Sequence, residues 1–228
     1  MKDLSTGLLV CALILLPLIA WSEARDLKSW NNRLVIPYLT SQPDRHTQKH
    51  TAGTTLPPVI NEDLILTPAN NPVLLTATTR INAGATLSLS PGTAIYAHEF
   101  SGIIIEGKLV AQGLKDEPIL FTSNELHPLN QTWNGLIVTG EGQATITHAI
   151  FHYASPALTC LADSNTTLNS SYITDASLGI FTDSSACHIK DSRINSIRDG
   201  IISIGLEPQI LDTAINALHN KTTYVRTF

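Results

Sequence analysis

The sequence has few cysteines and no apolar run of the length that a membrane span needs. The longest N-terminal apolar run, LLVCALILLPLIAW, covers residues 8–21 and contains Cys11, the first of three cysteines. A helical span needs about 20 apolar residues, so we expect no membrane span after signal cleavage. The run is followed by SEA at residues 22–24, an order typical of a secretory signal. We therefore predict a signal peptide over residues 1–24, with an uncleaved anchor as the alternative, and export to the periplasm, the cell surface or the extracellular space.

Basic charge is also scarce. Lys and Arg number 14 against 19 Asp and Glu, a formal net charge of −5. A mildly acidic chain gives no electrostatic reason to expect nucleic acid as a partner. Residues 25–58 are polar, contain four prolines and show no sustained period. We interpret them as a linker or an N-terminal cap.

A helical period is missing from residue 59 onward, where short apolar alternations are separated by Gly, Asn, Asp, Ser and Pro. From about residue 133 these alternations recur every 21 or 22 residues, while the upstream half follows the same pattern less regularly, and the signature of leucine-rich repeats is absent. Such a period is the mark of a solenoid. We predict an all-β parallel β-helix of about six or seven turns over residues 59–228. Its inward columns are Ile146, Leu168, Ile189 and Ile210; Phe151, Ile173, Ile194 and Ile215; and Leu136, Leu158, Ile180 and Ile201, while Gly135, Ala157, Gly179 and Gly200 keep the same step.

The upstream half carries a recurring phrasing. It reads GATLSLSPGT at 84–93, IIIEGKLVAQG at 103–113, PILFTS at 118–123 and WNGLIV at 133–138. These residues resemble the pectate-lyase-like repeat of right-handed parallel β-helix domains in exported bacterial proteins, over about residues 70–218. The resemblance implies a right-handed coil, and it implies little about activity because the matching residues are core and corner positions. ELHPLNQT at 125–132 interrupts the repeat and is expected to form a loop on one side.

One column of the repeat could carry chemistry. Aligned repeats place His148, Ser170, Asp191 and Asp212 together, with the two aspartates in successive turns. Such carboxylates would repel each other or share a cation. With Arg193 nearby, they could form a lyase-like site in which Ca²⁺ neutralises an acidic sugar and a basic side chain removes a proton. The alternative is a solvated corner where Asp and Ser suit the turn. Asp191, Asp212 and Arg193 are the candidate catalytic residues, Asp191 and Asp212 the candidate calcium ligands, and no other cofactor is expected.

A second polar column contains His152, Thr174, Asn195 and Asn216. Stacked asparagines can form amide ladders along a coil. We interpret this column as structural.

Cys160 and Cys187 remain after signal cleavage. The alignment places them in different strands of adjacent turns, both with inward parity. A disulfide forms if their Cβ atoms come within about 4 Å. Two buried thiols that pack as small apolar side chains are the alternative.

A regular core repeat without a recognisable catalytic set favours an exported, non-catalytic module that binds a polysaccharide or an envelope protein. The alternative is a carbohydrate-active enzyme, a polysaccharide lyase or hydrolase, with carboxylates on one wall of the helix.

Overall fold

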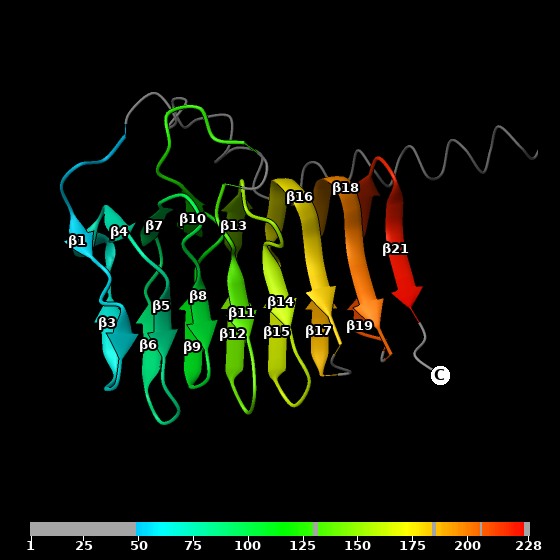
Figure 1. Cartoon of the computed structure of the whole chain (residues 1–228), viewed down its shortest axis with the longest axis horizontal. Coiled ribbons are helices and arrows are strands. Elements are labelled where there is room, and N and C mark those ends of the chain that lie inside the picture. The colour runs from blue at the N-terminus through cyan, green and yellow to red at the C-terminus, as the bar shows by residue number, and fades with distance from the viewer. Residues whose placement is uncertain (1–48, 130–131, 184–185, 206, 226–228) are drawn as a thin grey trace, which may run out of the picture. The chain divides into compact units, whose positions relative to one another are not determined.

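The chain folds as a right-handed parallel β-solenoid (Figure 1). The computed structural model describes residues 49–129, 132–183, 186–205 and 207–225. The predicted signal peptide at 1–24 and most of the predicted linker or cap lie outside these residues. All strand pairings in the described residues are parallel, and the helical content there is one 3₁₀ turn, η2 (Pro68–Asn70). No helix in those ranges has the length and the hydropathy to cross a bilayer.

Each turn of the solenoid passes through three walls. The first wall contains β1 (Thr54–Thr55), β4 (Val73–Leu75), β7 (Ala94–Ala97), β10 (Ile119–Ser123), β13 (Ala149–His152), the first halves of β16 (Tyr172–Thr182) and β18 (Arg193–Ile204), and β20 (Ala214–Ala217). The second wall contains β2 (Val59–Ile60), β5 (Thr79–Ile81), β8 (Ile103–Ile105), β11 (Leu136–Val138), β14 (Leu158–Cys160), the second halves of β16 and β18, and β21 (Asn220–Val225). The third wall is a separate 7-stranded sheet of β3 (Leu64–Leu66), β6 (Thr86–Leu89), β9 (Lys108–Gln112), β12 (Gln143–Thr147), β15 (Asn165–Asn169), β17 (Cys187–Lys190) and β19 (Gln209–Leu211). The 7 strands of the third wall mark seven turns, and β20 and β21 begin another.

The strand register confirms the predicted fold class and the predicted columns. On the third wall Leu168 pairs with Ile146 below it and with Ile189 above it. Ile189 in turn pairs with Ile210, so isoleucine or leucine occupies the same place in four successive turns. The other two columns pair in the same way, from Phe151 to Ile215 on the first wall and from Leu136 to Ile201 on the second.

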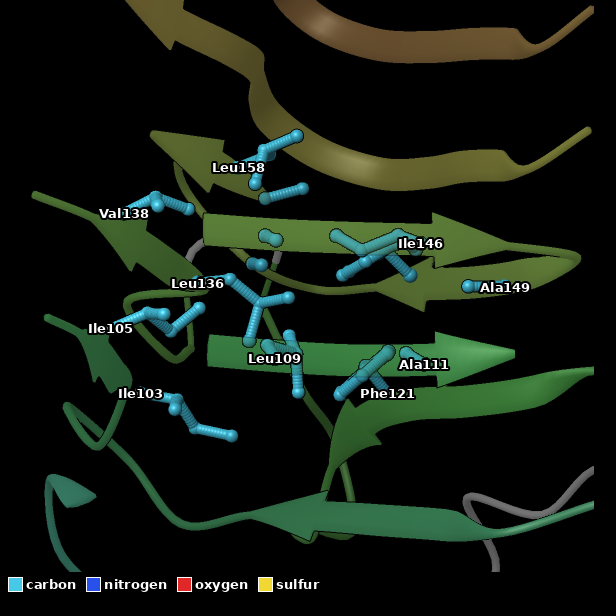
Figure 2. Packing of buried hydrophobic residues seen from close by; sticks show 14 of the residues in the cluster. Ile103, Ile105, Leu109, Ala111, Phe121, Leu136, Val138, Ile146, Ala149 and Leu158 are labelled. Atoms are coloured by element: carbon cyan, nitrogen blue, oxygen red, sulfur yellow. The ribbon is translucent and has the colours of Figure 1, made fainter. Parts of the chain in front are cut away.

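Inward side chains from the three walls fill the interior. Figure 2 shows Ile103 and Ile105 of the second wall projecting toward Leu109 of the third. The rings of Phe121 and Phe151 stack in successive turns with centroids 4.8 Å apart. Each fully buried Ile, Leu or Phe contributes about 1.5–3 kcal/mol relative to an exposed one. The solenoid is therefore held by a continuous apolar column, and each turn needs its neighbours to bury its own share.

Small residues stand where successive turns approach each other closely. A Cβ atom on Gly179 would collide with the carbonyl oxygen of Gly200 and with the side chain of Ile194. This contact explains the recurrence of small residues in the predicted Gly135–Ala157–Gly179–Gly200 column. The turn between β6 and β7 uses a different property, since Gly92 there has a φ of +77°.

The described end of the predicted linker or cap contacts the solenoid. Strand β1 pairs in parallel with β4 and so contributes to the first turn. The side-chain amide of Asn124 donates to the carbonyl oxygen of His50 (2.9 Å), and its oxygen accepts from the His50 N–H (2.9 Å). Lys49 pairs with Glu125 at 2.8 Å. Residues 49–50 therefore contact Asn124 and Glu125, at the start of the predicted loop at 125–132. Residues 130–131 of this loop lie outside the described residues.

Candidate functional site

The column that contains the two candidate aspartates is a corner of the solenoid. His148, Ser170, Asp191 and Asp212 each follow a strand of the third wall, and their φ angles are +48°, +47°, +48° and +47°. This left-handed backbone conformation is strained for most residues, and Asp and Asn tolerate it better than other non-glycine residues. The backbone of the corner therefore gives a sufficient reason for an aspartate at both positions.

The three candidate residues are close in sequence, but the structure places them in different environments. The side chain of Asp191 is 43% exposed and lies 3.8 Å from the Lys190 ammonium. Asp212 occupies the same corner one turn further along and is exposed. Arg193 lies beyond the corner on the first wall, half-buried and paired in register with Tyr172 and Ala214. In the described parts of the chain, no cluster of three or more His, Cys, Asp or Glu side chains could hold a metal ion.

A ladder of hydroxyl groups runs beside the corner, and the sequence reasoning missed it. The Ser171 Oγ accepts a hydrogen bond from the Ala149 N–H (3.1 Å), and the Ser192 Oγ accepts one from the Ser171 N–H (3.2 Å). Thr213 continues the ladder by accepting from the Ser192 N–H at 3.4 Å. Each hydroxyl also donates to the carbonyl two residues earlier, at 2.8, 2.7 and 2.9 Å. The signal was present in the sequence, since these hydroxyl residues keep the 21-residue step directly after the corner column.

The outward face of the first wall presents a polar surface over β13, β16, β18 and β20. We define the polar wall as His152, Tyr172, Asp175, Arg193, Asn195 and Asn216. The predicted amide ladder is present in it, because the Asn216 side-chain amide donates to the Asn195 oxygen at 2.9 Å. Asn195 in turn donates to the Tyr172 hydroxyl at 2.6 Å. Ile173 and Ile194 alternate with these residues and point inward. The same strands thus supply the core on one side and a row of donors and acceptors on the other.

A β-bulge brings Asp175 to His152 on this wall. Between the paired residues Ile173–Ile194 and Ala176–Ser196, strand β16 has one residue more than β18. Asp175 lies in this bulge with a φ of +54°, and its Oδ2 is 3.4 Å from Nδ1 of His152. The Trp133 indole N–H donates to the His152 carbonyl (2.8 Å), which helps to hold this part of the wall. Sequence reasoning placed His152 in the correct column but did not predict its contact with Asp175, because a bulge shifts the register by one residue.

The two cysteines meet inside the solenoid. Cys160 pairs with Val138 and Thr182, and Cys187 pairs with Thr166, as the alignment predicted. Both side chains are fully buried, and their sulfur atoms are 2.6 Å apart.

Three walls, parallel pairing throughout and a continuous inward column define the class as a right-handed parallel β-helix. Within that class, residues 58–158 match the family model of the pectate-lyase like beta helix domain. The chain therefore contains a pectate-lyase-like β-helix, which confirms the resemblance seen in the sequence, and the parallel pairing of successive turns continues beyond residue 158 through β16 to β21. No curated protein and no solved structure matched the chain. A domain of this kind fits a carbohydrate-related module and is typically extracellular.

Proposed function

We propose that the protein is an exported, non-catalytic β-helix module that binds a polysaccharide along its polar wall. One observation carries this proposal: the Asn216–Asn195–Tyr172 hydrogen-bonded row on the outer face of a pectate-lyase-like β-helix. Export is expected from the signal peptide predicted at residues 1–24.

The polar wall suits a ligand made of repeated polar units. Successive turns place equivalent side chains about 4.8 Å apart, so the wall offers its groups at a constant step. An amide has two N–H groups and an oxygen with two lone pairs, so Asn195 can bind a ligand hydroxyl while it keeps both ladder bonds. Tyr172 adds an aromatic ring with a polar end, which combines apolar contact with hydrogen bonding.

The arrangement of the aspartates supports binding rather than catalysis. Acid–base catalysis needs groups held within hydrogen-bond reach of one reacting centre. Asp191 and Asp212 occupy a corner whose left-handed backbone conformation explains why aspartate is found there. Arg193 lies on the adjoining wall. Asp191 has a lysine beside it, so its charge has a partner that requires no metal.

The competing function is a polysaccharide lyase or hydrolase. The contact between His152 and Asp175 favours it, since an imidazole oriented by a carboxylate is a common acid–base pair. If calcium assists this function through Asp191 and Asp212, added Ca²⁺ raises the melting temperature of the protein, and Asp212→Ala removes the rise. The non-catalytic proposal expects no such rise.

An array of acidic and neutral polysaccharides tests the proposal. Asn195→Ala combined with Asn216→Ala removes the ladder amides, and we expect binding to weaken about tenfold, the equivalent of one or two hydrogen bonds. The matched control is Asn165→Ala combined with Asn169→Ala, the same change on the outer face of β15 in the third wall. Equal loss in both double variants, or no glycan bound by the parent protein, contradicts the proposal. Melting temperatures of both variants separate lost binding from lost folding.

A further inference from the structure

The two buried cysteines lie in neighbouring turns and on different walls, so that no backbone pairing joins one cysteine directly to the other. Cys160 ends β14 on the second wall of the fifth turn, and Cys187 begins β17 on the third wall of the sixth. They are 27 positions apart in the chain. Because strands pair only with strands of the same wall, the contact between the sulfur atoms runs diagonally through the interior.

The surroundings of the two thiols argue against a metal site and against a reactive cysteine open to solvent. Both residues have an exposed fraction of 0%, and neither is near a group of His, Asp or Glu that would complete a metal site among the described residues. The sulfur atoms are 2.6 Å apart, so the roughly 2.05 Å of a disulfide requires only a small shift of either side chain.

We propose that Cys160 and Cys187 form a disulfide that ties the fifth turn of the solenoid to the sixth. The bond forms by exchange with a protein disulfide of the thiol–disulfide oxidoreductase class. One thiol, as its thiolate, attacks the oxidant's disulfide, and the second thiolate then displaces the oxidant's sulfur. Both protein sulfurs are oxidised, and the oxidant leaves as a dithiol that carries the two electrons and two protons.

The order of events follows from burial. Desolvation raises the pKa of the Cys160 thiol well above its usual value, and the hydrogen bond with Cys187 raises it further. The thiolate is the reactive form, so the folded dithiol reacts slowly. The exchange therefore takes place before the sixth turn closes over Cys160, in an oxidising compartment that the exported chain enters unfolded.

Alkylation of the unfolded, unreduced protein gives the first test. The full chain is expressed with its own N-terminus through an export pathway, denatured with iodoacetamide present, and digested. We expect Cys160 and Cys187 without the alkyl group and in one linked peptide, 2 Da lighter than the dithiol pair. Peptide mapping scores Cys11 separately, so an uncleaved N-terminus does not affect the result. Alkylated Cys160 and Cys187, or a link from either to Cys11, overturns the proposal.

Thermal unfolding gives the second test. A disulfide that closes a loop of this length restricts the unfolded chain and so stabilises the folded one. In a domain of this size, loss of the disulfide lowers the melting temperature by an amount on the order of 10 °C. We expect this decrease in melting temperature in Cys160→Ala/Cys187→Ala relative to the oxidised parent, and also in the parent refolded under reductant. Reductant should leave the double variant unchanged. A parent that melts at the same temperature with and without reductant contradicts the proposal, and glycan binding on the polar wall is independent of either outcome.

Discussion

At the scale of single residues, backbone conformation decides which side chains occupy the corners. Asp191 and Asp212 have φ angles of +48° and +47°, equal within one degree to those of His148 and Ser170 in earlier turns. A charged pair chosen for chemistry would not require histidine and serine at the same place with the same backbone. The conformation of the turn is therefore sufficient to account for the residue types of this column.

Substitutions of Asp191 test this account. Asp191→Gly should change the free energy of unfolding by less than about 0.5 kcal/mol, because glycine adopts a positive φ freely. Asp191→Val should lower it by about 1–2 kcal/mol, because a β-branched residue is strained there. Chemical denaturation of both variants measures the difference.

Lys190→Val is the matched control, since Lys190 is an exposed strand residue directly before the corner. We expect it to stay within about 0.5 kcal/mol of the parent. A Val at 191 that is tolerated as well as a Val at 190 would show that the corner does not impose its conformation.

His148 makes part of the stability depend on pH. Burial lowers its pKa below the usual 6.5, and the nearby Lys115 ammonium lowers it further. As the pH falls below 6.5, the unfolded chain therefore takes up a proton before the folded chain does. The contribution of this group is complete above pH 6.5 and is lost as the pH falls toward the folded pKa. The parent should lose more stability between pH 7.5 and pH 5 than His148→Asn, which suits the same backbone and does not titrate. Urea midpoints at both pH values measure the loss, and parallel losses in the two proteins would exclude His148 as the source.

At the scale of strands and corners, hydrogen-bond ladders fix each turn on the one before it. The hydroxyls of Ser171, Ser192 and Thr213 each accept from a backbone N–H of the turn before and donate to a carbonyl of their own corner. This arrangement pairs backbone groups where the chain bends and strand pairing is interrupted. The ladder therefore continues the sheet across the corner.

Ser192→Ala removes the middle of this ladder. It leaves the Ser171 N–H without its acceptor, whereas the Lys190 carbonyl keeps the hydrogen bond from the Ser170 N–H (3.1 Å), and Ser192 itself is fully buried. We expect a loss of about 1–3 kcal/mol in the free energy of unfolding, the cost of a buried N–H left unpaired. Ser88→Ala, on the outward face of β6, is the control and should cost less than about 0.5 kcal/mol. Equal small losses at both positions would show that the ladder contributes no stability.

The elements differ in how far the sequence could predict them. The inward columns from Ile146 to Ile210 were predictable because apolar burial acts on every turn alike and leaves a period of 21 or 22 residues. The Asn195–Asn216 ladder was predictable because it follows the same period. The contact between His152 and Asp175 was not, because it depends on a bulge that breaks the register and on two side-chain rotamers.

At the scale of the whole molecule, the solenoid places its apolar core inside the coil and the polar wall on an outer face. The inward faces of the three walls supply a continuous apolar interior. The polar wall occupies the outward face of the first wall in its last turns, over β13, β16, β18 and β20 (β13, β16 and β18 run from green to orange in Figure 1). Under the proposed function, this division lets the polar wall bind a regular polymer without any change in the core.

The central claim, that this wall binds a polysaccharide and leaves it intact, is tested most directly by one measurement. The purified protein is incubated with each polysaccharide it binds, and the recovered polymer is assayed over time for chain length, new reducing ends and unsaturated products. The account predicts bound polymer of unchanged length, and no products above those given by the Asn195→Ala/Asn216→Ala variant. New reducing ends or unsaturated products that appear with the parent protein and disappear with His152→Ala would contradict it.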